Sequence, residues 1–106
     1  MTNDTRGTFS EVIHAPLRLR ICGLLRNVDE LDFALIRDAL QIDDAKTSKH
    51  LKTLVDAGFV ARRQERSPER TEARRLTWGG LTPSGSSALE AHLAALSSIA
   101  DGTPIQ

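Results

Sequence analysis

Apolar residues recur every three or four positions in four stretches of the chain, a spacing typical of helices that bury one face. The first repeat follows Leu17 with Ile21, Leu24, Leu25 and Val28. Pro16 suits the first turn of this helix, but it would break a helix that began near Phe9. We therefore expect the helical pattern of residues 9–28 to be interrupted between His14 and Pro16.

A short extended piece and a second helix are expected next. The extended piece covers residues 30–33, and the helix covers residues 33–40. Its buried side is expected to consist of Ala34, Leu35 or Ile36, Ala39 and Leu40. A turn over residues 41–43 follows, in which Ile42 points inward.

The third helix, over residues 43–58, combines one apolar face with one lysine face. The positions expected on the apolar face are Thr47, Leu51, Leu54 and Val55. The lysines on the opposite side are Lys46, Lys49 and Lys52. Asp43 or Asp44 can cap the start of the helix, and Gly58 can end it in the left-handed conformation. A helix that packs by one side and offers lysines on the other has the shape needed to enter a DNA major groove.

A β-hairpin and a last helix complete the chain. The predicted strands cover residues 59–64 and 75–81, with a charged loop between them, and Phe59 and Trp78 are expected on their core side. Thr82 is expected to cap the last helix, with Pro83 in its first turn. The apolar stripe of this helix contains Ala88, Leu89, Leu93, Leu96 and Ile99 or Ala100.

This order predicts a mainly α fold with a small β-hairpin, a winged helix-turn-helix in which the elements run α-(β)-α-α-β-β-α. The expected divisions are a flexible N-terminal segment over 1–13, a winged-helix DNA-binding domain over 14–82, a C-terminal dimerisation helix over 83–101 and a tail over 102–106. A chain of 106 residues supports one such domain.

Charge is unevenly distributed although the net charge is zero. Residues 28–44 carry one Arg against six Asp and Glu, whereas residues 45–75 carry three Lys and six Arg against four acidic residues. The positive block coincides with the lysine helix and the hairpin, and local charge density governs contact with phosphates. A solvated surface on which charges happen to cluster is the alternative.

Several classes of function find no support in the sequence. Cys22 is the single cysteine, which excludes an internal disulfide and a CxxC zinc site. No pairing of nucleophile and base, phosphate loop or cofactor motif is present, so we expect no enzyme, no cofactor and no metal. Because no apolar run could span a membrane and the first residues do not form a signal peptide, a cytoplasmic protein is expected.

Four motifs in order resemble the compact winged-helix transcriptional regulators of the MarR and ArsR type. They are H-x-P-x-R-L-x-I with L-L from His14, L-D-F from Leu31, S-K-H-L-x-x-L-x-x-A-G-F-V from Ser48, and T-W-x-x-L-T-P-x-G-x-x-A-L from Thr77. The resemblance implies a homodimeric DNA-binding regulator with the lysine helix in the major groove and the hairpin as the wing.

The chain departs from this pattern in three places. Thr47 replaces a large apolar residue, so the core is expected to be thinner there. Gly79 and Gly80 replace residues with side chains, and the base of the wing is expected to bend or carry a bulge. The cysteine pair of metal-sensing relatives is missing from the lysine helix, so metal sensing at that site is not expected.

Candidate DNA contacts follow from the way helix-turn-helix proteins dock, with the first half of the second helix at the base edges. Base or groove contacts are expected from Ala45, Lys46, Ser48 and Lys49, and phosphate contacts from Lys52 and Thr53. Contacts from the wing are expected from Arg62, Arg66, Arg70 and Arg74, with Arg70 at the tip. The alternatives are solubilising lysines and a Ser48 hydroxyl bonded to its own backbone. For the wing we expect some arginines to pair with Glu residues within the wing, and Arg66 and Arg70 to be free.

The expected partners are double-stranded DNA, a second copy of the chain and an unknown small-molecule effector bound between the helices of the dimer. The predicted dimer interface consists of Leu89, His92, Leu93, Leu96 and Ile99. The competing hypothesis is a protein-interaction module that docks a partner through residues 28–44 and this stripe.

Three further side chains have open interpretations. His50 is expected to be partly buried, with a DNA contact as the alternative, and His14 is expected to position the first helix. Cys22 is either packing material or a redox-sensing thiol beside Arg18 and Arg26.

Overall fold

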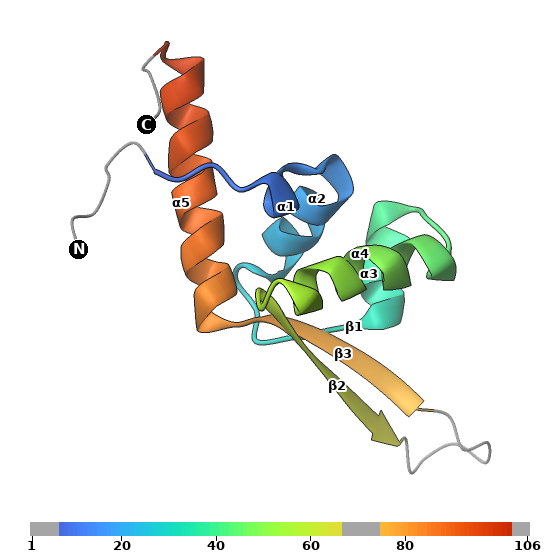
Figure 1. Ribbon diagram of the computed structural model, residues 1–106. Coiled ribbons are helices and arrows are strands. Elements are labelled where there is room, and N and C mark those ends of the chain that lie inside the picture. The colour runs from blue at the N-terminus through green and yellow to red at the C-terminus, as the bar shows by residue number, and fades with distance from the viewer. Residues whose placement is uncertain (1–6, 67–74, 103–106) are drawn as a thin grey trace.

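The computed structural model describes residues 7–66 and 75–102, and within them the predicted order of elements is confirmed (Figure 1). The helices are α1 (Glu11–His14), α2 (Pro16–Leu25), α3 (Phe33–Leu40), α4 (Asp44–Asp56) and α5 (Pro83–Ala100). The strands are β1 (Leu31–Asp32), β2 (Val60–Arg66) and β3 (Arg75–Leu81). The hairpin of β2 and β3 projects from one side of the helices, and α5 stands at the other side. The expected break before Pro16 separates α1 from α2.

The three strands form an antiparallel sheet in the order β1-β3-β2. The hairpin ladder runs without interruption from Val60↔Leu81 to Arg66↔Arg75, so the expected bulge at the two glycines is absent and β2 is longer than predicted. Gly80 has another role. A Cβ there would lie 2.3 Å from the carbonyl oxygen of Asp29, so this position admits the close approach of the chain that leads into β1.

Short polar side chains begin four of the helices, the first being Ser10 before α1. Asp43 accepts the backbone N–H of Lys46 at 2.8 Å, and it, rather than Asp44, caps α4. Thr82 caps α5 by accepting the N–H of Gly85 at 2.9 Å, and Asp32 caps α3. These caps satisfy N–H groups that have no partner within their helix. Gly58, with φ +80°, follows α4 in the left-handed conformation, as expected.

One core joins the helices to the sheet. Its buried apolar residues are Ile13, Ile21, Cys22, Leu25, Ile36, Leu40, Leu51, Leu54, Val60 and Leu89. Thr47 is also fully buried, and its hydroxyl donates to the carbonyl of Asp43 at 2.9 Å. The polar Thr that stands here in place of a large apolar residue therefore buries no unpaired hydroxyl. Of the two alternatives for α3, Ile36 is buried and Leu35 is 58% exposed. The prediction for Ala39 is wrong, because the helix turns Ile36 and Leu40 inward and leaves Ala39 exposed.

Trp78 lies on the face of the sheet opposite to that predicted. A Cβ at Gly79 would touch Ile36, Leu51 and Val60, so Gly79 faces the core. Because neighbouring residues of a strand point to opposite faces, Trp78 lies on the outer face. Phe59 does pack against the core, as predicted.

The N-terminal boundary is also corrected. Residues 7–13 were predicted to be flexible with the rest of 1–13, but residues 7–10 cross α5 and residues 11–13 belong to α1 (Figure 1). Thr8 donates its N–H to the carbonyl of Ala91 at 3.0 Å, and Ile13 is fully buried. The segment is therefore held by a backbone hydrogen bond and by the side chains of Phe9, Val12 and Ile13.

Candidate nucleic-acid interface

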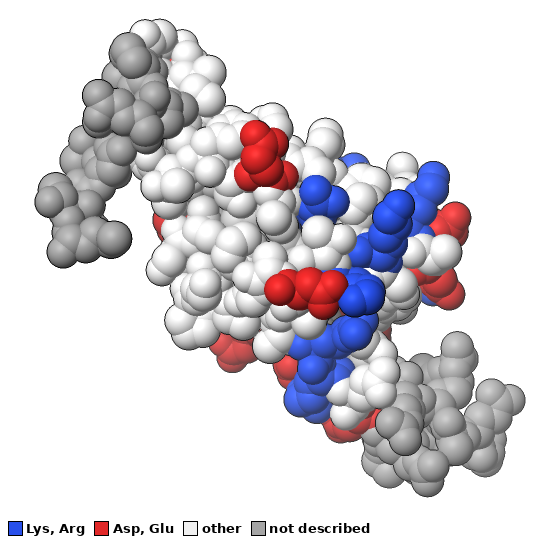
Figure 2. All heavy atoms as spheres, viewed as in Figure 1, with Lys and Arg blue, Asp and Glu red and all other residues white. Residues whose placement is uncertain are grey.

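The exposed face of α4 carries five of the ten residues predicted to contact DNA. Ala45, Lys46, Ser48, Lys49 and Lys52 are exposed, whereas Thr53 is half-buried. The opposite face holds Thr47, Leu51 and Leu54 in the core. Figure 2 shows Lys and Arg side chains gathered on the side of the molecule formed by α4 and the hairpin, while the surface over α5 in this view carries few charges.

The three lysines of α4 differ in their partners. Within the described residues, Lys46 and Lys49 form no ion pair or side-chain hydrogen bond. Lys52 pairs with Asp56, one turn further along the helix, at 2.8 Å. Thr53 donates its hydroxyl to the carbonyl of Lys49 at 3.1 Å, which leaves it only as an acceptor. Of the three α4 lysines, Lys46 and Lys49 are therefore the ones available to an external anion.

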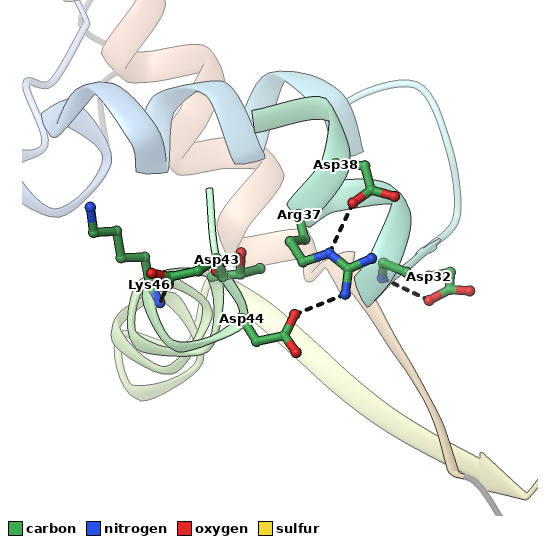
Figure 3. A network of polar contacts seen from close by, with 8 residues as sticks. Asp32, Arg37, Asp38, Asp43, Asp44 and Lys46 are labelled. Atoms are coloured by element: carbon green, nitrogen blue, oxygen red, sulfur yellow. Dashed lines mark hydrogen bonds and ion pairs between the residues drawn. The ribbon is translucent and has the colours of Figure 1, made fainter. Parts of the chain in front are cut away.

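An ion-pair bridge fixes the start of α4 against α3 (Figure 3). The guanidinium of Arg37 donates to Asp38 at 2.9 Å and to Asp44 at 2.8 Å. These hydrogen bonds raise the pKa of Arg37 above its ordinary value. The bridge compensates the charge of Asp44, which lies beside the lysine face and would otherwise repel an approaching phosphate.

A hollow of about 280 Å³ separates the first turns of α4 from the hairpin. It is lined by Phe33, Asp44, Ser48, Arg62, Gln64 and Thr77. Arg62 has no ion-pair partner among the described residues. A free guanidinium, an amide and two hydroxyls in one concave surface are groups that hydrogen-bond phosphate oxygens.

The other predicted wing residues are placed only in part. Arg70 and Arg74 lie outside the described residues, and of Arg66 only the backbone, at the end of β2, is described. Arg63 forms ion pairs with Glu30 and Glu65, so the predicted Arg–Glu pairing within the wing holds for one arginine. The hydrogen bond from Arg63 lowers the pKa of Glu30.

His50 lies half-buried on the flank of α4, in agreement with the favoured interpretation. Its Nδ1 is 3.3 Å from the guanidinium of Arg18, which also donates to the carbonyl of Val12. Burial, and then the positive charges of Arg18 and Lys49, lower the pKa of His50. The imidazole therefore joins α4 to α2 as a neutral group.

The predicted dimer residues divide into two sets. Leu89 and His92 are buried within the single chain, so their assignment to an interface is wrong. Leu93 and Leu96 are half-buried, and Ile99 is 50% exposed. The error arises because Leu89 belongs to the core of the single chain, and because residues 9–14 contact His92.

His92 is the anchor for this covering segment. Its Nδ1 accepts the N–H of Ser10 at 2.9 Å, and its ring lies 4.8 Å from that of Phe9 and 5.4 Å from that of His14. Burial, and then the nearby His14, lower the pKa of His92, against a smaller opposing effect of Glu11. His14 thus helps position α1, as expected, through its ring contacts with the segment.

Cys22 is packing material rather than an exposed thiol. The side chain is fully buried in the core, and burial raises its pKa to about 11 despite the opposing charge of Arg18. A redox-sensing cysteine needs an accessible thiolate, which this site does not provide.

In the described ranges, no cluster of three His, Cys, Asp or Glu side chains could hold a metal ion, and no helix is long and apolar enough to cross a bilayer.

Comparisons with known proteins agree with this geometry. The family model described as a winged helix DNA-binding domain matches residues 17–100. No curated protein sequence matches the chain.

Several solved structures share the fold, and three of them illustrate the likeness. A transcriptional regulator homologue from Pyrococcus horikoshii OT3 is 22% identical, with a TM-score of 0.76 and 88% of each chain covered. NadR in complex with 4-hydroxyphenylacetate is 24% identical, with a TM-score of 0.64 over 87% of this chain and 62% of that one. The zinc-responsive MarR family member ZitR from Lactococcus lactis is 22% identical, with a TM-score of 0.59 over 88% of this chain and 60% of that one. The chain thus spans about six-tenths of the length of NadR and of ZitR.

Proposed function

Because the chain belongs to the winged helix DNA-binding domain family, whose members are not enzymes, we propose that it is a sequence-specific transcriptional regulator that acts as a homodimer. The observation that carries the proposal is the state of Lys46 and Lys49. Both ammonium groups are exposed on the outer face of α4 and have no internal partner in the described part of the chain, while the inner face of the helix is buried.

The third predicted helix, α4, is proposed to enter the major groove by its first half. Lys46, Ser48 and Lys49 then lie at or near the base edges, as does Ala45, which offers a methyl group to thymine. Lys52 and Thr53 lie further along the helix and are proposed as phosphate contacts. Lys52 must then exchange Asp56 for a phosphate oxygen, and the Thr53 hydroxyl must turn its hydrogen from the carbonyl of Lys49 to the phosphate.

The wing is proposed to contact the DNA backbone or the minor groove. The hollow between α4 and the hairpin supports this proposal, because Arg62 and Ser48 face it from opposite sides. A phosphodiester strand seated there would receive hydrogen bonds from both elements. Arg66, Arg70 and Arg74 remain proposed wing contacts.

Dimerisation is proposed through the outer end of α5, where Leu93, Leu96 and Ile99 form the remaining apolar stripe. Ile99→Glu should convert the dimer to a monomer, because it places a charge in an apolar interface. Leu35→Glu is the matched control, since Leu35 is a similarly exposed apolar residue on α3. Light scattering gives the mass of each variant. A dimeric Ile99→Glu protein, or a monomeric Leu35→Glu protein, would contradict this interface.

The proposed effector is a small molecule that binds between the helices of the dimer. The 4-hydroxyphenylacetate bound in the structure of NadR supports this class of ligand. That compound is the first probe: a rise in the unfolding temperature of the purified protein shows binding.

The proposed function is tested by selecting fragments of the source genome on the purified protein. We expect enrichment of fragments with an inverted repeat, because a twofold dimer presents two copies of α4 about one helical turn of DNA apart. The Lys46→Ala/Lys49→Ala variant should lose the enrichment. Recovery of no DNA, together with capture of another protein through residues 28–44, would favour an interaction module instead.

A further inference from the structure

Arg63 spans the outer face of the sheet. It lies in β2, whereas Glu30 comes just before β1, and β3 separates these two strands. The guanidinium nevertheless reaches Glu30 with two of its nitrogens, and a third nitrogen donates to Glu65 at 2.7 Å. It crosses β3 over Trp78, with the guanidinium carbon 5.5 Å from the centre of the indole ring.

The two adjacent arginines of β2 point to opposite faces of the sheet and so have different surroundings. Arg62 faces the hollow beside α4 and has no carboxylate partner in the described residues. Arg63 points to the other face, where two carboxylates compensate its charge. Arg63 is therefore poorly placed to act as a phosphate contact, although the sequence gives the two residues the same chemistry.

The contact lies where the hairpin joins the rest of the molecule. The hairpin extends away from the helices, and β1 pairs with β3 at only two positions, Leu31↔Gly79 and Asp32↔Trp78 (Figure 1). The Arg63–Glu30 contact adds a connection from the far strand of the hairpin to the chain before β1. The packing of Asp29 against Gly80 lies beside it.

We propose that Arg63, Glu30 and Trp78 form a strap that fixes the angle of the hairpin relative to α4, and that Arg63 is a positioning residue for DNA binding through Arg62 and the rest of the wing. This inference rests on the proposed function. The strap holds the wing where it can meet the DNA at the same time as α4, so that the free protein does not have to order the wing on binding.

The decisive test is Glu30→Ala, because two effects of the substitution have opposite signs. Removal of an acidic residue and release of Arg63 should strengthen DNA binding if only charge matters. If the strap positions the wing, binding should instead weaken, by about fivefold. Asp29→Ala removes the same charge from an exposed neighbour that makes no ion pair in the described residues, so it should leave affinity within about twofold of the original. Equal or tighter binding by Glu30→Ala than by Asp29→Ala overturns the proposal.

The reversed pair Glu30→Arg/Arg63→Glu supplies a rescue experiment, since it keeps the net charge and restores an attraction across β3. It should recover part of the affinity lost by Glu30→Ala. A reversed pair that binds more weakly than Glu30→Ala contradicts the strap.

A distance measurement without DNA separates the strap from the proposed function. Spin labels on Arg66→Cys at the end of β2 and Ser97→Cys on α5 report the hairpin angle, and buried Cys22 stays unlabelled. Labelled chains are diluted with unlabelled chains so that each distance lies within one protomer. The distribution should broaden or shift in Glu30→Ala and stay unchanged in Asp29→Ala. An identical distribution in both variants overturns the strap, even if the protein binds DNA as proposed. If the protein does not bind DNA, the distance measurement still tests the strap.

Discussion

The polar groups on the outer face of α4 and those around α5 differ in whether they have partners within the chain. On α4, Lys46 and Lys49 stay exposed and unpaired within the described residues. Around α5, the polar groups are used inside the chain: His92 accepts from Ser10, and the carbonyl of Ala91 accepts from Thr8. Folding uses the second set within the chain, although Nε2 of His92 is buried without a hydrogen-bond partner in the described residues, and it leaves the first set for a ligand. Substitutions at the two places should therefore change different properties, stability around α5 and DNA affinity on α4.

The largest effect is expected for Gly85→Ala at the start of α5. A Cβ there would lie 1.9 Å from the carbonyl oxygen of Phe59, which already accepts the N–H of Thr82 at 3.0 Å and cannot move freely. The free energy of unfolding should fall by about 3 kcal/mol, while the affinity of the folded protein for DNA is retained. Urea unfolding measures this change.

Gly23→Ala is the matched control for Gly85→Ala. Gly23 lies in α2 with no atom within 4 Å of its added Cβ, so this substitution should raise the free energy of unfolding by about 0.5–1 kcal/mol. Equal destabilisation by both substitutions would show that crowding against Phe59 is not the cause.

The second-largest effect is expected on α4, where substitutions should reduce DNA affinity and leave stability nearly unchanged. Lys46→Ala/Lys49→Ala should weaken DNA binding by about 30-fold and change the free energy of unfolding by less than about 0.5 kcal/mol. Lys52→Ala should weaken binding by only about threefold, because Asp56 already neutralises this lysine in the free protein. Titration of a fluorescent operator measures affinity. A similar loss in both proteins would mean that the internal ion pair does not matter.

A smaller effect is expected on the pH dependence of the free energy of unfolding, through His92 on α5. The pKa of His92 in the folded chain lies below its ordinary 6.5, chiefly because the ring is buried. As pH falls through that value, the unfolded chain takes up a proton first, so the free energy of unfolding decreases. His92→Gln, which can still accept the N–H of Ser10, should reduce this decrease between about pH 7.5 and pH 5.5. His50 keeps its own contribution of the same sign. An unchanged pH dependence in His92→Gln would contradict the role given to burial.

Local sequence signals predicted the helices and their caps well. Pro16, Asp43, Gly58 and Thr82 act where the sequence places them, because capping and turn formation depend on a few neighbouring residues. The apolar face of α4 followed from its period, and the buried Thr47 fits the same pattern. The matches of fold and family confirm the arrangement that these signals indicated.

Contacts between distant segments were not predictable in the same way. His92 is buried beside a segment that lies far away in the sequence, and it accepts a hydrogen bond from Ser10, 82 residues earlier in the chain. The side of the sheet on which Trp78 lies depends on the register of β3, which Gly79 and Gly80 conceal because they carry no apolar side chain. Arg62 and Arg63 look alike in sequence, and only the strand alternation and the position of Glu30 distinguish them.

The most direct test of the account is the salt dependence of binding to an operator recovered from the genome. The logarithm of the binding constant should fall steeply and linearly with the logarithm of the salt concentration, because each neutralised phosphate releases counterions. In Lys46→Ala/Lys49→Ala the slope should become shallower by about one for each lysine that contacts a phosphate. Binding that is independent of salt, or a slope that the double substitution leaves unchanged, would contradict the central claim that the exposed face of α4 meets DNA.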